Sequence, residues 1–187
     1  MAPPTRTSRA TWIDAGLHAL ATGGPEAVRI EPLAQRLGVT RGGFYGHFKN
    51  RHDFLDEMLD TWEQRSTDDV LERVESEGGD ARARIRLAGI LTFREELLLV
   101  DLAVRDWARR DEAVAHRLRR VDDRRMDYLR AQIGTVCPDP DEVEARTLLA
   151  FTLAIGNHFV SRRSRAEVVE LAPVSYTHLT LPTNREV

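Results

Sequence analysis

The chain has 187 residues, with 27 lysines and arginines against 30 aspartates and glutamates, so its formal net charge at pH 7 is -3. A 42% share of apolar residues excludes a disordered or fibrous protein, and a single cysteine excludes an internal disulfide framework and a cysteine-rich zinc site. No apolar run approaches the ~18 residues of a membrane span, and the N-terminal residues lack the apolar stretch of a secretory signal. We expect a soluble, cytoplasmic globular protein with no membrane partner.

The first predicted helix is indicated by apolar residues at helical spacing between residues 12 and 20. Thr7 or Ser8 can cap its N-terminus with a side-chain oxygen. The sequence GGP at 23–25 ends it, because glycine and proline both disfavour continuation of a helix.

Two short helices are predicted next, at about 30–37 and 40–47, with Gly38 between them. Pro32 lies in the first turn of the earlier one, where its missing N–H costs little. After them, Asn50 can cap a longer helix that carries an apolar stripe.

Four more amphipathic segments are expected after the Gly-Gly-Asp break at 78–80. They begin near residues 81, 97, 114 and 141, and the last runs to about 161. Its middle, residues 148–155, is apolar nearly all round, which predicts burial in the core or packing on a partner. No segment shows the alternation of a strand, so we predict an all-α fold of eight or nine helices.

Residues 30–50, IEPLAQRLGVTRGGFYGHFKN, combine a helix, a glycine turn, a second short helix, an aromatic pair and a cap. This pattern predicts a helix-turn-helix in which Gly38 provides the turn. The residues expected to bury the inner face are Leu33, Ala34, Leu37, Val39 and Phe44. The outer face of the second helix is left to solvent or to a DNA groove.

Positive charge is concentrated in the same segment. Residues 36–52 include four basic side chains and no acidic one, although the chain as a whole is acidic, with a pI of about 6.1. A phosphate-binding surface needs such a local field rather than a high overall pI. The alternative is an ordinary solvated basic helix face.

The stretch LAQRLGVTRGGFYGHFKNRHDFLDEML resembles the DNA-binding module of the tetracycline-repressor (TetR) family of bacterial transcription regulators. The similarity extends over about residues 7–62, and beyond it only the number and length of the helices are similar. The shared positions are Leu33, Ala34, Leu37, Gly38, Val39, Tyr45, His47, Phe48, Lys49, Asn50 and Leu55. The resemblance implies a three-helix DNA-binding domain at 1–62 and a C-terminal helical bundle at 63–173 for effector binding and dimerisation.

By this resemblance the helix at 40–47 is the recognition helix, whose N-terminal residues contact base edges in the major groove. Arg41 is the best candidate for reading a base, because its fork can pair with guanine O6 and N7. Gly42 and Gly43 would let the backbone approach the bases. The implied DNA-binding residues are Arg29, Thr40, Arg41, Gly42, Gly43, Tyr45, His47, Lys49 and Asn50.

Some of these residues also have a structural interpretation. His47 can bond within the module instead of contacting a phosphate. Tyr45 and Phe48 can both be core aromatics, and we favour the core for Phe48 and DNA contact for Tyr45. Arg29 departs from the family pattern, which usually has Thr or Ser at that position. An arginine cannot cap the helix as a hydroxyl does, although it can reach a phosphate.

The C-terminal part is expected to hold the effector and the dimer interface. Two copies of segment 148–155 can form a four-helix interface, and the alternative is burial within one chain. An effector pocket would lie between helices, and each of its candidate residues is otherwise ordinary core. The candidate lining residues are Phe93, Trp107, Tyr128, Phe151, Asn157 and His158.

We therefore expect a homodimeric, ligand-responsive transcriptional repressor that binds a pseudo-palindromic double-stranded DNA operator and is nucleoid-associated when bound. The effector is an unknown small molecule, hydrophobic or amphipathic. No metal, P-loop or dinucleotide motif and no catalytic constellation occurs, so neither a cofactor nor an enzymatic activity is expected. The alternative is a helical small-molecule or protein-binding module that has lost DNA binding, since Arg41 stands nearly alone among glycines as a base reader.

The last residues form a separate case. Residues 174–183, VSYTHLTLPT, resemble the translation of a transposon-based sequencing adapter. We expect residues 174–187 to be artefactual and the native sequence to end near Pro173. In that case residues 165–172 are only the beginning of the longer last helix that the family usually has.

Overall fold

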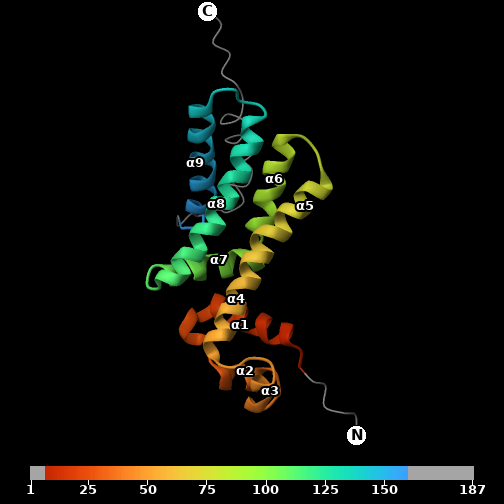
Figure 1. The fold of residues 1–187 in the computed structure, drawn as a ribbon, viewed down its shortest axis with the longest axis vertical. Coiled ribbons are helices and arrows are strands. Elements are labelled where there is room, and N and C mark those ends of the chain that lie inside the picture. Colours follow the sequence, from red (N-terminus) through yellow and green to blue (C-terminus); the bar gives the residue numbers. More distant parts are fainter. Residues whose placement is uncertain (1–6, 160–187) are drawn as a thin grey trace, which may run out of the picture. The chain divides into compact units, whose positions relative to one another are not determined.

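The computed structural model describes residues 7–159, and within them the backbone forms helices and no strand (Figure 1). This confirms the prediction of an all-α fold. The α-helices are α1 (Arg9–Gly23), α2 (Ile30–Arg36), α3 (Arg41–Tyr45), α4 (Arg51–Glu63), α5 (Asp69–Glu77), α6 (Ala81–Thr92), α7 (Glu95–Ala108), α8 (Glu112–Gly134) and α9 (Pro140–Gly156). A 3-10 turn, η1 (Pro25–Ala27), follows α1, and a π-helical turn, η2 (Gln64–Asp68), joins α4 to α5.

The helices pack as two compact units. Of the described residues, the first unit contains Thr7–Glu72 together with Leu91–Val121, and the second contains Arg73–Ile90 together with Asp122–Phe159. The first unit extends beyond the expected domain boundary at residue 62, because α7 packs directly on α1. The functional division at that boundary stays a prediction.

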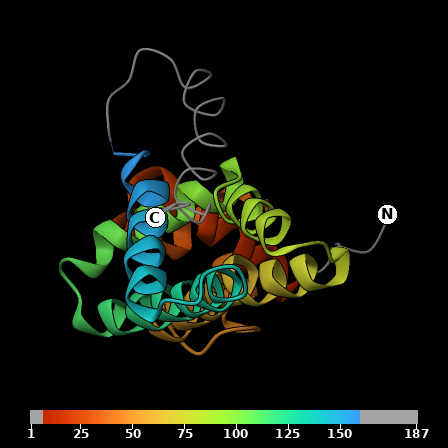
Figure 2. The ribbon, with the colours of Figure 1, turned by 90° about the horizontal axis from the view of Figure 1, so that it is seen from above.

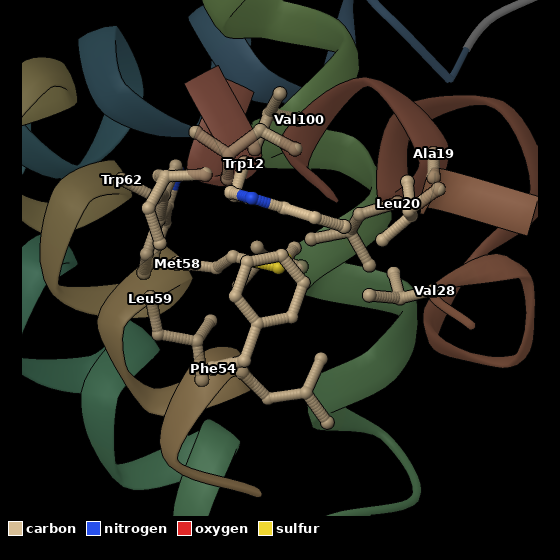
Figure 3. Packing of buried hydrophobic residues seen from close by; sticks show 14 of the residues in the cluster. Trp12, Ala19, Leu20, Val28, Phe54, Met58, Leu59, Trp62 and Val100 are labelled. Carbon is tan, nitrogen blue, oxygen red and sulfur yellow. The ribbon is translucent and has the colours of Figure 1, made fainter. Parts of the chain in front are cut away.

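Side chains from α1, α4 and α7 build the core of the first unit (Figure 3). Trp12, Phe54 and Met58 are fully buried there. Gly16 allows α1 and α4 to cross closely, because a Cβ atom at this position would lie 2.5 Å from Met58 Sδ and 2.6 Å from Phe54 Cζ. This crossing fixes α4, the helix that follows the helix-turn-helix, against α1.

The helix caps follow the sequence expectations. The Ser8 side chain accepts a hydrogen bond from the Thr11 N–H at 3.1 Å, so Ser8 rather than Thr7 caps α1. The Asn50 side chain accepts from the Asp53 N–H at 2.9 Å at the start of α4. Each cap satisfies a backbone donor that a helix terminus would otherwise leave unpaired.

The second unit has a smaller core around Ile85, Ile133 and Val143. Helix α9 runs alongside the later part of α8 (Figures 1 and 2), and Arg130 Nε donates to Glu144 Oε2 at 2.7 Å between them. The two helices are thus joined by an ion pair at the edge of an apolar contact.

Helix α9 leaves much of its apolar surface uncovered. Leu148 and Leu149 are each 54% exposed and Leu153 is 47% exposed, whereas Thr147 and Ala150 are buried. The alternative that segment 148–155 is buried wholly within one chain is therefore wrong for these three leucines. The end of the last helix expected at 161 and the segments at 165–172 and 174–187 lie outside the described residues.

Candidate nucleic-acid interface

The turn between α2 and α3 is built around Gly38. Its φ is +67°, in the left-handed region that favours glycine. The Val39 N–H donates to the Ala34 carbonyl at 3.0 Å, and the Gly38 N–H donates to the Gln35 carbonyl at 3.1 Å. This is the Schellman arrangement that ends a helix cleanly. Helix α3 then starts at Arg41 and ends at Tyr45, so the predicted recognition helix is shorter than the expected segment 40–47.

Phe44 attaches α3 to its support. It is fully buried, and its ring meets the rings of Trp12 at 5.4 Å and Phe54 at 5.3 Å in edge-on geometry. Phe48 is 2% exposed and packs on the same rings, which confirms its predicted place in the core. Tyr45, the neighbour of Phe44, is 48% exposed and is therefore not a core residue.

Arg41 and Tyr45 lie together on the outward side of α3. Arg41 Nη2 donates to the Tyr45 hydroxyl at 3.2 Å, and the guanidinium carbon lies 5.7 Å from the centre of the Tyr45 ring. Arg41 Nη1 also lies 3.0 Å from Glu31 Oε1 of α2. The hydrogen bond to Tyr45 and the charge of Glu31 raise the pKa of Arg41, so its side chain stays cationic.

Gly42 and Gly43 are exposed on the same helix. A Cβ atom at Gly42 would meet Thr40 Oγ1 at 3.6 Å, and one at Gly43 would meet Val39 Cβ at 3.9 Å. Both distances are ordinary van der Waals contacts, so packing within the chain does not require glycine here. The space that these glycines leave open faces outward.

Four further basic side chains around the turn divide into two groups. Arg51 is structural, because its Nε and Nη2 donate to the carbonyls of Val28 at 2.8 Å and Pro25 at 2.6 Å. Arg29, Arg36 and Lys49 are exposed, and none of them has an ion pair with another residue between 7 and 159. Contact of Arg29 and Lys49 with phosphates stays a prediction.

The remaining residues predicted to contact DNA differ in how far their side chains are bonded within the chain. His47 is half-buried, and its Nε2 lies 2.8 Å from the Thr7 carbonyl oxygen, which supports its structural interpretation. The Asn50 side chain serves as the α4 cap. Thr40 stands at the N-cap of α3 with no side-chain capping bond, and Arg29 occupies the same position in α2, also without one.

Two further residues of this module, neither indicated by the sequence, hold its side chains in place. Arg9 of α1 binds the Glu57 carboxylate, donates to the His47 carbonyl and lies 4.7 Å above the Phe48 ring. Glu31 holds Arg41 across the turn. Both contacts join segments that only the folded helix-turn-helix brings together, so no local sequence motif indicates them.

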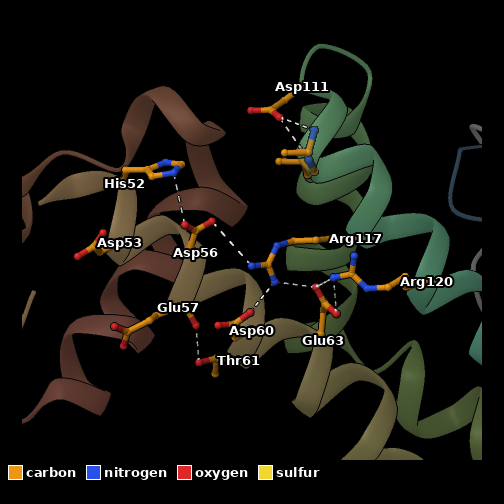
Figure 4. Close-up of polar contacts among 12 residues, drawn as sticks. His52, Asp53, Asp56, Glu57, Asp60, Thr61, Glu63, Asp111, Arg117 and Arg120 are labelled. Atoms are coloured by element: carbon orange, nitrogen blue, oxygen red, sulfur yellow. Dashed lines mark hydrogen bonds and ion pairs between the residues drawn. The ribbon is translucent and has the colours of Figure 1, made fainter.

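Helix α4 is tied to the first part of α8 by a charged cluster within the first unit (Figure 4). Arg117 Nη1 lies 2.5 Å from Asp60 Oδ1 and 2.8 Å from Glu63 Oε1, and Arg120 Nη2 donates to Glu63 Oε1 at 3.0 Å. Burial lowers the pKa of Arg117, but the hydrogen bonds to Asp60 and Glu63 outweigh burial and raise it overall. Helix α4, which follows the helix-turn-helix, is thus held from a second side.

The predicted effector-pocket residues do not all belong to one unit. Phe93 and Trp107 lie in the first unit, and Tyr128, Phe151, Asn157 and His158 lie in the second. Trp107 belongs to the apolar core of the first unit. The Tyr128 hydroxyl donates to Glu75 Oε1 at 2.7 Å, and burial together with this bond raises the pKa of Tyr128.

The described part of the chain offers neither a membrane span nor a metal cluster. No helix there is both long and apolar enough to cross a membrane. No group of three or more histidine, cysteine or acidic side chains there is placed to hold a metal ion.

Comparison with known proteins bears on this module directly. Residues 13–58, which extend from α1 into α4, match the family model of bacterial regulatory proteins of the tetR family. No curated protein matches the chain by sequence.

Solved structures share the fold over nearly the whole chain. A Rhodococcus sp. protein assigned to the TetR family of transcriptional regulators superposes with a TM-score of 0.68 at 22% identity, covering 93% of this chain and 98% of that one. A transcriptional regulator from Rhodococcus sp. Rha1 gives 0.65 at 21% identity, with 93% and 92% covered. A protein of Streptomyces coelicolor A3(2) assigned as a transcriptional regulator gives 0.66 at 18% identity, with 96% and 100% covered. The helix-turn-helix thus matches the family model of bacterial regulatory proteins of the tetR family over residues 13–58, and the chain shares its fold with these solved structures.

Proposed function

We propose that the protein is a ligand-responsive repressor that binds a pseudo-palindromic operator as a homodimer. The observation that supports DNA binding is the arrangement of α3. Arg41 and Tyr45 are exposed on its outward side, and Phe44 packs its inward side against the core. Arg41 would read guanine through its fork, worth ~1–3 kcal/mol of discrimination. Arg29, Thr40 and Lys49 would contact phosphates, which position the module without reading sequence.

The proposed dimer surface is the apolar side of α9. Leu148, Leu149 and Leu153 are exposed there in the single chain, and pairing with a second copy would remove them from water. Two modules on a two-fold axis would then place their recognition helices in major grooves ~34–36 Å apart. The C-terminal bundle, residues 63–173, would provide this surface and the effector site.

The effector is proposed to be a small hydrophobic or amphipathic molecule bound between helices of the C-terminal part. It would favour a state of the dimer whose module spacing no longer fits the operator. Each candidate residue stays a candidate for the lining of such a site within its own unit.

Selection of bound sequences from a random DNA library, followed by gel-shift titration, tests the DNA-binding role. Arg41→Ala should weaken binding to the selected sequence and relax one base position, whereas Lys49→Ala should weaken binding to all sequences alike. Arg82→Ala, which removes an exposed cation of α6 in the second unit, is the control. Failure of the unaltered protein to select any sequence would favour a helical binding module that has lost DNA binding.

A further inference from the structure

Glu31 is an acidic residue on the exposed side of the otherwise basic helix-turn-helix. It lies in the first turn of α2 and is 61% exposed, and its carboxylate reaches across the Gly38 turn to Arg41 at the start of α3. The Oε1–Nη1 distance is 3.0 Å. The candidate base-reading side chain is therefore held by a carboxylate before any DNA arrives.

The guanidinium of Arg41 has two anchors. Glu31 engages Nη1, and the Tyr45 hydroxyl accepts from Nη2 at 3.2 Å. A guanidinium carries five N–H groups in a fixed fork, so three remain after these two contacts, including one on each terminal nitrogen. Two of those donors suffice for a bidentate bond to guanine O6 and N7. Both anchors thus restrict the side chain without using up its capacity to read a base.

The charge of Glu31 has a second consequence. A free arginine at the start of the recognition helix would bind any nearby phosphate, and such contacts add affinity without adding sequence information. A carboxylate 3.0 Å from the guanidinium offsets its charge and repels phosphate oxygens. Arg41 then gains binding free energy mainly from a correctly placed base. The pair therefore improves discrimination between DNA sequences by disfavouring contact of Arg41 with phosphates.

We propose that Glu31 is a specificity-determining residue of this module, which holds Arg41 for base reading and prevents it from acting as a phosphate clamp. This inference rests on the proposed DNA-binding function. The structural alternative is that Glu31 only complements the dipole of α2 from its first turn. That role would stabilise the helix but would leave the base preference of Arg41 unchanged.

The test compares Glu31→Gln with Glu26→Gln in the full chain. Glu26 is also an exposed acid in the first turn of a short helical segment, η1, so its substitution controls for the loss of one negative charge. Each variant is taken through sequence selection, and its affinity for a non-specific duplex is measured by fluorescence anisotropy at several salt concentrations. Arg41→Ala and the double variant with Glu31→Gln complete the cycle.

We expect Glu31→Gln to reduce discrimination at the base position read by Arg41 by about twofold to fivefold, the range of an exposed ion pair. The slope of log affinity against log salt concentration for this variant should become more negative by ~0.9, because the released Arg41 would neutralise one additional phosphate. Glu26→Gln should change neither quantity, and Glu31→Gln should have no further effect on base preference in the Arg41→Ala background.

Two failures of this experiment are distinguishable. If the wild-type protein selects a sequence and Glu31→Gln behaves as Glu26→Gln does, the role of Glu31 is overturned and the DNA-binding function stands. If the wild-type protein selects no sequence, the proposed function itself is overturned, and the role of Glu31 is lost with it.

Discussion

The indole ring of Trp12 in α1 meets the phenyl ring of Phe44 in α3 edge-on, with the ring centres 5.4 Å apart and the planes at 78°. Phe44 also meets Phe54 of α4, so a single side chain joins α3 to both of its supporting helices. Helix α3 has only five residues and little intrinsic stability of its own. The placement of Arg41 and Tyr45 therefore depends on the anchor behind them.

Replacement of Phe44 should unfold the module, while replacement of its neighbour should not. Phe44→Ala removes a fully buried ring and is expected to lower the free energy of unfolding by ~3–5 kcal/mol, measured by urea denaturation. Tyr45→Ala, at a 48% exposed site, should change it by less than ~1 kcal/mol and should reduce DNA affinity instead. Equal destabilisation by both changes would contradict the assignment of the two sides of α3.

Two glycines should respond to alanine in opposite ways. At Gly16 the new methyl group would lie 2.5 Å from Met58 Sδ, and the overpacking is expected to cost ~1–3 kcal/mol of unfolding free energy. At Gly43 its nearest contact would be Val39 at 3.9 Å, so the variant should be as stable as the wild type or up to ~1 kcal/mol more stable. Thermal melting of the two variants measures both effects.

The Gly43→Ala protein should nevertheless bind DNA less tightly, because its methyl group extends into the space that the backbone would need near the bases. The gel-shift affinity of this stable variant separates a DNA role of the glycine from a folding role. Unchanged affinity would show that the open space at Gly43 is not used for DNA.

Stability at acid pH should depend on Glu142 in the second unit. Hydrogen bonds from Arg146 and from the Cys137 thiol lower the pKa of this carboxyl below its ordinary value. A lowered pKa in the folded state means that the contribution to stability is present at neutral pH and is lost as the pH falls through that lowered value.

Glu142→Gln should therefore be less stable than the wild type at pH 7, and the difference should close as the pH falls below the ordinary glutamate pKa of about 4.3. Urea unfolding of both proteins across that range provides the measurement. A difference that stays constant with pH would assign the effect to side-chain packing rather than to the carboxylate charge.

The helix-turn-helix could be predicted from the sequence because its determinants are local. Gly38 has the positive φ that the turn requires, and Asn50 caps α4 through a residue three positions later. Phe48 is predicted to lie in the core, and it is buried there. Such features depend on residues close together in the chain, so a short stretch of sequence is enough to predict them.

Contacts across long sequence distances could not be predicted. The packing of α7 on α1 extends the first unit beyond residue 62, and only the assembled core determines it. Glu31 and Arg41 are paired by the angle between two helices rather than by a motif. The fold divides the candidate pocket residues between two units, because helix packing and not residue type determines which side chains come together.

The central claim is that the outward side of α3 reads a DNA sequence. Its most direct test is the ratio of affinities for the selected duplex and a scrambled duplex of the same composition, measured by fluorescence anisotropy at one salt concentration. We predict a ratio of at least ~10³ for the wild-type protein, the lower end for specific regulators, and a lower ratio for Arg41→Ala. A wild-type ratio near one, or a ratio that Arg41→Ala leaves unchanged, would contradict this account.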